Sequence, residues 1–237
     1  MPTPTTDAKL TCHRDQTRFF ALCWTAYFST YIGRLNFTAG LAQIAGSTGF
    51  SQTELGIVSS AFFMSYGIFQ LIWGILGDRL NPVRIVFFGV FGSGLCNLAM
   101  AMAPSPRWMA LFWAINGVVQ SAVWSPLLGL TVSRLPSHEA MTFSVRYSTT
   151  VPAGTFAAYA LTALCAALNR WRLAFFLAGG ILIAIGLIWL RGMRVLAPNP
   201  VSAGKKSPSP NGQKGNFRVV LLLIPIVLSA AANGLIR

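Results

Sequence analysis

Seven long apolar runs constrain this chain more than any other feature of its sequence. They lie at about 19–44, 54–76, 85–103, 108–132, 142–168, 173–190 and 219–236. A helix of about 20 apolar residues crosses the roughly 30 Å hydrocarbon core of a bilayer, and most of these runs reach that length. Short polar connectors separate the first six runs. The pattern predicts an all-α membrane protein with several spans.

The composition excludes several other classes of protein. Of the 237 residues, 54% are hydrophobic and only 10% are charged, whereas soluble domains carry about 25% charge. An ordinary soluble enzyme, a disordered chain and a nucleic-acid-binding domain are therefore excluded, despite a net charge of +13. The four cysteines form no C-x-x-C pair, so we expect no disulfide, no metal site and no cofactor. No phosphate-binding G-x-x-x-x-G-K-[ST] loop is present, which argues against an ATP-driven pump.

Residues 191–218 form the only candidate boundary between domains. This segment holds four prolines and six basic residues, a composition typical of a flexible linker. It divides the chain into a polar tail at 1–18, a six-helix unit at 19–190, the basic linker at 191–218, and a seventh span at 219–237 that begins a second unit.

The basic residues predict which way the chain crosses the membrane. With a cytoplasmic N-terminus, twelve Lys and Arg residues fall on the inner side and three, Arg107, Arg170 and Arg172, on the outer side. Cytoplasmic loops carry the excess of Lys and Arg in membrane proteins. We therefore expect a multi-pass protein of the cell (inner) membrane with its tail and linker in the cytoplasm.

One cation interrupts the first apolar run. Phe19 to Gly33 covers only 15 residues, or about 22 Å, so the helix must continue through Arg34 to cross the membrane. Tyr27 and Tyr31 lie on the same helix face as Arg34. This predicts a buried cation that faces a cavity; the alternative is an Arg that extends to the outer membrane surface.

Polar side chains also line one face of other runs. The second run has Tyr66, Gln70 and Trp73, the fourth has Asn116, Gln120 and Trp124, and the fifth has Thr149 and Thr150. Each set is consistent with packing between helices or with a shared aqueous cavity. We expect runs one, two, four and five to face the cavity, with three and six nearer lipid. Arg146, close to the start of the fifth run, is expected to extend to the cytoplasmic surface.

The apolar runs contain no Asp or His, and their one Glu, Glu54, is the first residue of the second run, at the helix start. Intramembrane carboxylates or histidines are the usual proton carriers of transport proteins. The spans offer cations and hydroxyl groups instead, so the simplest ligand is a small anion.

The connector after the second run carries a specific motif. Gly74-Ile-Leu-Gly-Asp78-Arg79, followed by Arg84, resembles the G-x-L-x-D-R-x-x-x-x-R loop of the major facilitator superfamily. The resemblance implies twelve spans in two halves, each built from two inverted three-helix repeats. It also implies that Asp78, Arg79 and Arg84 control gating and do not contact substrate.

Three stretches resemble the organophosphate:phosphate antiporter branch of that superfamily. They are Tyr27-x3-Tyr31-x2-Arg34-x-Asn36-Phe37, Asp78-Arg79-x-Asn81-Pro82, and Gly117-x2-Gln120-x3-Trp124-Ser125-Pro126 followed by His138-Glu139. In that branch one Arg on helix one and one on helix seven clamp the phosphate. The resemblance implies such roles for Arg34 and Arg237, although composition alone leaves Arg237 equally compatible with an outer flank. The expected substrate site is Tyr27, Tyr31, Arg34, Tyr66, Gln70, Thr150 and Arg237.

Two departures from the glycerol-phosphate transporters affect the expected substrate. Gln70 stands where they have a Lys, and Thr150 where they have a His. We therefore expect an exchanger of small organic anions, phosphate esters for phosphate, that works by alternating access and is not an enzyme. The chain resembles the N-terminal half plus helix seven, a fragment whose partner is the missing C-terminal half. The alternatives are a symporter of sugar acids with protons and a membrane remnant that transports nothing.

Overall fold

The computed structural model describes residues 9–10, 12–76 and 80–196. The chain divides into two compact units, 1–203 and 204–237, and every described residue belongs to the first. This part contains helices and no strand. The elements are α1 (His13–Thr48), α2 (Gln52–Leu76), α3 (Pro82–Met102), α4 (Pro106–Ser121), α5 (Trp124–Arg134), α6 (Ser137–Arg146), the 3₁₀ turn η2 (Tyr147–Thr149), α7 (Thr150–Ala167) and α8 (Trp171–Leu196).

Six of the seven apolar runs are helical, which confirms the all-α membrane fold. Five segments are long and apolar enough to cross a bilayer: Gln52–Gly74, Pro82–Met102, Pro106–Arg134, Ser137–Ala167 and Trp171–Leu196. The longest helix, α1, has 36 residues but is more polar than these five. The predicted seventh span and most of the linker lie outside the described residues, although α8 continues to Leu196, past the expected end at residue 190.

Two of the six spans are broken, and prolines explain both breaks. The fourth span consists of α4 and α5, which meet at residues 122–123, and the fifth consists of α6, η2 and α7. A helical proline lacks a backbone N–H and its ring clashes with the carbonyl four residues earlier. Pro126 places that clash at Ala122, and Pro152 places it at Ser148 within η2. The regular α-helix is therefore interrupted at the points that these prolines select.

Capping side chains fix where helices begin. At α2, the Ser51 backbone N–H donates to Glu54 Oε2 over 2.9 Å, and the Glu54 N–H donates back to Ser51 Oγ over 3.2 Å, a reciprocal capping box. At α3, Asn81 Oδ1 accepts the Val83 N–H at 3.0 Å, and Pro82 occupies the first turn, where a missing N–H costs nothing. The Asn81-Pro82 pair is thus a helix start.

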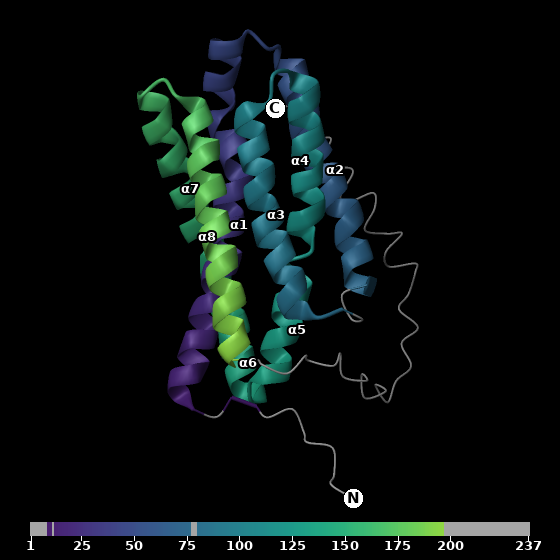
Figure 1. Cartoon of the computed structure of the whole chain (residues 1–237), viewed down its shortest axis with the longest axis vertical. Helices are drawn as coiled ribbons and strands as arrows, with labels where there is room; N and C mark the ends of the chain where they lie inside the picture. The colour runs from purple at the N-terminus through teal and green to yellow at the C-terminus, as the bar shows by residue number, and fades with distance from the viewer. Residues whose placement is uncertain (1–8, 11, 77–79, 197–237) are drawn as a thin grey trace, which may run out of the picture. The chain divides into compact units, whose positions relative to one another are not determined.

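The helix packing has the symmetry of two inverted three-helix repeats (Figure 1). The main helix pairs are α1 with α7 and α8, α4 with α2 and α3, and α3 with α8. When the first three spans are exchanged for the last three, α1 corresponds to α4, α2 to α7 and α3 to α8. The α1–α7 pair then becomes α4–α2, the α1–α8 pair becomes α4–α3, and the α3–α8 pair maps onto itself. Such a pairing is expected for repeats related by a two-fold axis in the membrane plane.

Helices α3 and α8 approach closely at two glycines, Gly94 and Gly179, and each glycine lies against the carbonyl oxygen of the other. A Cβ on Gly94 would lie 3.0 Å from the Gly179 carbonyl oxygen, and a Cβ on Gly179 would lie 2.9 Å from the Gly94 carbonyl oxygen. Small residues let membrane helices approach this closely and so supply much of their packing energy. These two glycines therefore set the distance between the halves of the bundle.

Gly179→Ala is expected to destabilise the bundle by about 1–3 kcal/mol, the usual cost of overpacking. The neighbouring Gly180 offers a matched control, because a Cβ there meets nothing within 4 Å. Thermal unfolding of the purified chain in detergent should show a lowered midpoint for Gly179→Ala and an unchanged or higher one for Gly180→Ala. Equal midpoints for the two variants would mean that the glycine crossing does not control the packing.

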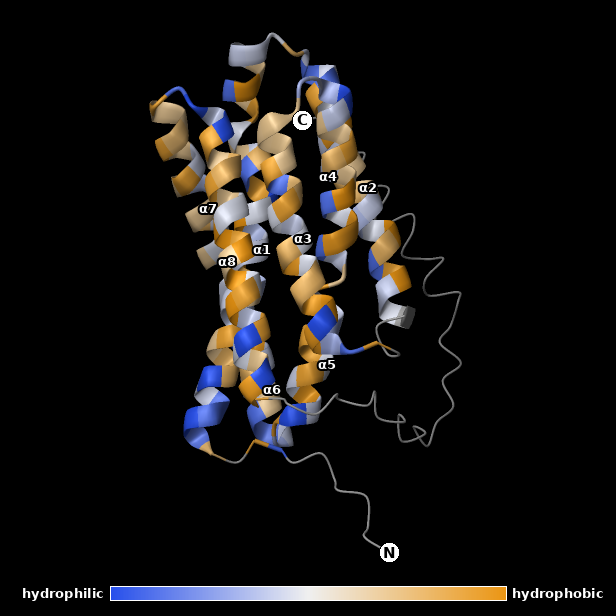
Figure 2. Ribbon diagram, in the orientation of Figure 1, coloured by the Kyte–Doolittle hydropathy of each residue, from blue (hydrophilic) through white to orange (hydrophobic). Residues whose placement is uncertain are grey.

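The two ends of the bundle differ in charge. Figure 2 shows that hydrophilic residues gather mostly at the helix ends and hydrophobic residues along the middle. The end where α1 begins and α8 finishes carries seven of the described basic residues: Lys9, Arg14, Arg18, Arg84, Arg134, Arg191 and Arg194. The opposite end carries Arg107, Arg170 and Arg172.

Candidate functional site

Arg34 lies in the middle third of α1 against two aromatic rings. Its guanidinium carbon is 3.9 Å from the centroid of the Tyr31 ring and 5.8 Å from that of Tyr66 on α2. Both distances are within the range of cation–π attraction. No ion pair joins Arg34 to a carboxylate of the described residues. The Arg34 charge therefore remains available to an anion.

Arg34 opens onto a cavity of about 390 Å³ between three helices. Its lining is Tyr31, Arg34 and Leu35 from α1, Phe62 and Phe63 from α2, and Thr155 and Tyr159 from α7. This volume suits a small organic molecule. One cation, two phenols and one hydroxyl are set in an otherwise apolar wall, which is a lining that orients a small anion.

A buried hydrogen-bonded belt fixes the backbone next to Arg34. The carbonyl oxygen of Gly33 accepts two amide hydrogen bonds of 3.0 Å each, from Asn97 Nδ2 on α3 and from Asn116 Nδ2 on α4. Asn36 Nδ2 donates to Asn97 Oδ1 over 2.7 Å. Arg34 is thus bracketed by two residues that are bonded to other spans, which holds its backbone at one depth in the bundle.

The belt continues away from the cavity between α3 and α4. Ser93 Oγ donates to Asn116 Oδ1, and Gln120 Nε2 donates to Ser93 Oγ, both over 2.7 Å. Asn116 is fully buried and Gln120 is 2% exposed. Asn116 and Gln120 therefore pack between helices and do not face a shared aqueous cavity. The belt separates one apolar cluster around Phe19, Leu127 and Trp189 from another around Phe37, Trp113 and Phe175.

The ring of Tyr27, one helical turn before Tyr31, adds to the aromatic wall that Tyr31 and Tyr66 form beside Arg34. The two rings meet edge to face with centroids 5.6 Å apart, and Trp124 on α5 lies 4.7 Å from Tyr27. Tyr27, Tyr31, Arg34 and Tyr66 are therefore brought together by α1 and α2. Trp124 is the fourth span's contribution to this wall.

The other predicted residues lie elsewhere or outside the described part. Thr150 is buried, and its hydroxyl donates to the Tyr147 carbonyl oxygen over 2.6 Å, so it does not line the cavity. Gln70 is exposed on α2, one turn beyond Tyr66. Arg84 is exposed in the first turn of α3. Arg237, Asp78 and Arg79 lie outside the described residues.

Arg146 is exposed near the end of α6, with its guanidinium carbon 6.0 Å from the ring of Phe143 one turn earlier. It does not line the cavity.

Sequence reasoning missed the contribution of α7. Thr155 and Tyr159 are four residues apart and share one face of that helix, and this face lines the cavity. The same spacing had identified Tyr27 and Tyr31, so the signal was present. Phe62 and Phe63 gave no such signal, because apolar side chains on a membrane helix look the same whether they face lipid or a cavity. In the described part, no group of three or more His, Cys, Asp or Glu side chains is placed to hold a metal ion.

Comparison with known proteins agrees with this fold. A family model for the Major Facilitator Superfamily matches residues 23–236. A solved structure of a peptide transporter, POT (E310Q mutant, in complex with sulfate), superposes with a TM-score of 0.64 at 15% identity and covers 95% of this chain and 47% of that one. At this identity the likeness concerns the fold alone.

Two curated relatives are similar in sequence. A probable hexose phosphate transport protein of Chlamydia pneumoniae is 28% identical over 195 residues, which cover 81% of this chain and 43% of that protein. A glycerol-3-phosphate transporter of Bacillus subtilis is 32% identical over 117 residues, which cover 48% of this chain and 26% of that protein. The chain thus spans less than half the length of either relative.

Proposed function

The chain belongs to the major facilitator superfamily, a family of multi-pass membrane transporters and not of enzymes, and on this premise we propose that it forms the first six-helix half of a transporter that exchanges phosphate esters for phosphate. The observation that carries this proposal is the Arg34 guanidinium, which faces a cavity at mid-span with no described carboxylate beside it. Alternating access would expose this cavity to each side of the membrane in turn.

Phosphate is the anion that best matches Arg34. A guanidinium offers planar, paired N–H donors that bind two phosphate oxygens at once, and such charge-assisted bonds are the strong ones. Holding an Arg at the centre of a membrane helix costs about 2.5–3.5 kcal/mol on insertion scales, which a binding role explains. Arg237 is proposed as the opposing cation, and Tyr27, Tyr31 and Tyr66 as hydroxyl donors.

The rest of the substrate is proposed to be neutral and hydroxylated. Gln70 stands where the glycerol-phosphate branch has a Lys, so α2 brings one positive charge fewer to this side of the bundle. Leu35, Phe62 and Phe63 supply apolar walls and Thr155 and Tyr159 hydroxyl groups. This chemistry favours a sugar phosphate over a substrate with a second anionic group.

Transport assays in liposomes test this function. With the full-length protein reconstituted and phosphate trapped inside, we expect uptake of labelled hexose phosphate that depends on internal phosphate and is unaffected by a collapsed pH gradient. Sugar-acid uptake that requires the pH gradient would instead establish the proton symporter. Absence of uptake for every phosphate ester and sugar acid would support a protein that does not transport.

We also propose that the N-terminus is cytoplasmic, because the end of the bundle where α1 begins holds the larger number of basic residues. The native cysteines offer a direct measurement, since Cys12 is exposed while Cys23, Cys96 and Cys165 are buried. An impermeant maleimide should label Cys12 in inside-out membrane vesicles and leave it unlabelled in right-side-out vesicles.

A matched control comes from the opposite end of the bundle. With Cys12 replaced by Ser, Arg170→Cys, an exposed position between α7 and α8, should label only in right-side-out vesicles. The reverse pattern for the two cysteines would invert the proposed orientation.

A further inference from the structure

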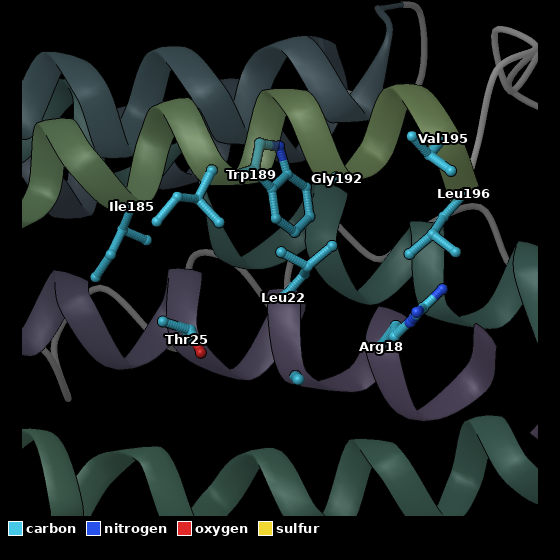
Figure 3. Close-up of a pocket in the computed structure, with 10 residues that line it drawn as sticks. Arg18, Leu22, Thr25, Ile185, Trp189, Gly192, Val195 and Leu196 are labelled. Carbon is cyan, nitrogen blue, oxygen red and sulfur yellow. The ribbon is translucent and has the colours of Figure 1, made fainter. Parts of the chain in front are cut away.

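A second cavity lies on a different face of the bundle, in a groove between α1 and α8 (Figure 3). Its volume is about 420 Å³, and its walls are almost entirely aliphatic and aromatic, with Leu22 on α1 and Ile185, Ile188 and Trp189 on α8 among them. It shares no residue with the Arg34 cavity. A wall of this kind has no donor set for a sugar or a phosphate along most of its length.

Positive charge gathers where the groove reaches the end of the bundle. Arg18 lines the groove there, and Figure 3 shows its side chain extending from α1 toward Leu196 on α8. Arg14 lies one turn earlier on the same face of α1. Arg191 lies within one turn of both Ile188 and Val195, which line the groove from α8.

Within the described residues, one acid beside Arg18, Asp15, partly opposes this charge. Asp15 lies 3.9 Å from Arg18, but the two side chains are 39% and 55% exposed. Surface pairs at such a distance are weak, because water and salt screen them. The three arginines therefore leave a net positive charge around the open end of the groove.

The groove also has the length of one membrane leaflet. Ile185 to Leu196 rises about 16 Å along α8, and half of a roughly 30 Å hydrocarbon core is about 15 Å. An apolar channel of that length with cations at its outer end matches a molecule with an apolar chain and an anionic head. Basic pockets between membrane helices bind such lipid headgroups.

We propose that this groove is a binding site for an anionic phospholipid, with an acyl chain packed along Leu22, Ile188 and Trp189 and the phosphate held by Arg18. Arg14 and Arg191 add to the attraction for the headgroup. The lipid would fill the groove between α1 and α8, so its binding would stabilise α1, the helix that also carries Arg34.

Native mass spectrometry of the purified chain tests this site with two lipids that share the same acyl chains. Phosphatidylglycerol should bind more tightly than zwitterionic phosphatidylcholine. One basic residue near a membrane surface contributes about 1 kcal/mol toward an anionic lipid, so Arg18→Gln should lower the preference for phosphatidylglycerol about fivefold. Arg172→Gln, an exposed arginine at the opposite end of α8, should leave this preference unchanged.

A second variant tests the part of the groove that would hold the acyl chain, separately from the charge. Ala21 lines the groove and is exposed, so Ala21→Trp should obstruct the channel without disturbing the core and should weaken binding of both lipids. Ala42→Trp, at another exposed position of α1, is its control. Equal binding of the two lipids, or an Arg18→Gln variant that keeps the full preference, would overturn the proposal. Displacement of phosphatidylglycerol by inorganic phosphate alone would also overturn it, because it would reveal a simple anion site.

Discussion

Arg34→Lys is expected to weaken binding of a phosphate ester about 10- to 100-fold, although it keeps the positive charge. Hydrogen bonds to charged groups contribute about 1.5–3 kcal/mol, and the substitution removes one arm of the paired contact. Lysine is a point charge on a flexible stem and does not reproduce the planar fork. It also lacks the flat surface that lies 3.9 Å from the Tyr31 ring. Equilibrium binding of a labelled hexose phosphate to the full-length protein measures this loss.

Arg146→Lys is the matched control for this experiment. Arg146 is exposed near the end of α6 and does not line the cavity, so the same substitution there should leave affinity near that of the parent. If Arg34→Lys bound and exchanged substrate like the parent, the paired contact would be wrong. Arg34 would then be an arginine that extends to the membrane surface, the alternative that helix length alone left open.

Much of the fold and part of the site could be predicted because they depend on short-range rules. Span length follows from bilayer thickness, and the mid-helix position of Arg34 follows from counting the 15 residues before it. The shared face of Tyr27, Tyr31 and Arg34 follows from helical periodicity. Each of these inferences needs only one helix at a time.

What the sequence did not reveal is which helix faces which. Asn116 and Gln120 share a polar face, and periodicity alone does not say whether that face meets water or another span. The structure places it against Ser93 on α3 and Gly33 on α1. Similarly, Thr150 was expected in the site, but its hydroxyl is bonded to the Tyr147 carbonyl oxygen of the preceding turn. Thr155 and Tyr159, further along α7, line the cavity instead.

Gly117→Ala is expected to damage both the fold and the Arg34 site. A Cβ at this position of α4 would lie 2.5 Å from the Phe62 carbonyl oxygen and 3.1 Å from the Tyr66 backbone nitrogen, and it would clash with Ser65 Oγ. Two of these three atoms belong to the α2 backbone, so a change of rotamer does not relieve the contact. We expect α2 to move away from α4 at a cost of about 1–3 kcal/mol.

The displacement would reach the substrate because α2 carries one wall of the cavity. Phe62 lines the cavity, and the Tyr66 ring lies 5.8 Å from the Arg34 guanidinium carbon. The shift would also break the hydrogen bond of 2.8 Å that Ser65 Oγ donates to the Ala114 carbonyl oxygen on α4. Gly117→Ala should therefore lower the unfolding midpoint and weaken phosphate-ester binding together.

Gly67→Ala separates this effect from a general sensitivity of α2 and α4 to substitution. Gly67 follows Tyr66 directly, yet a Cβ there meets nothing within 4 Å, so both the unfolding midpoint and the affinity should stay near those of the parent. Restoring space with Ser65→Gly in the Gly117→Ala background should recover only part of the loss, because the Phe62 carbonyl oxygen remains in place. A Gly117→Ala protein with unchanged stability and affinity would show that α2 is free to shift without cost. The position of α2 would then not be what holds Tyr66 beside Arg34.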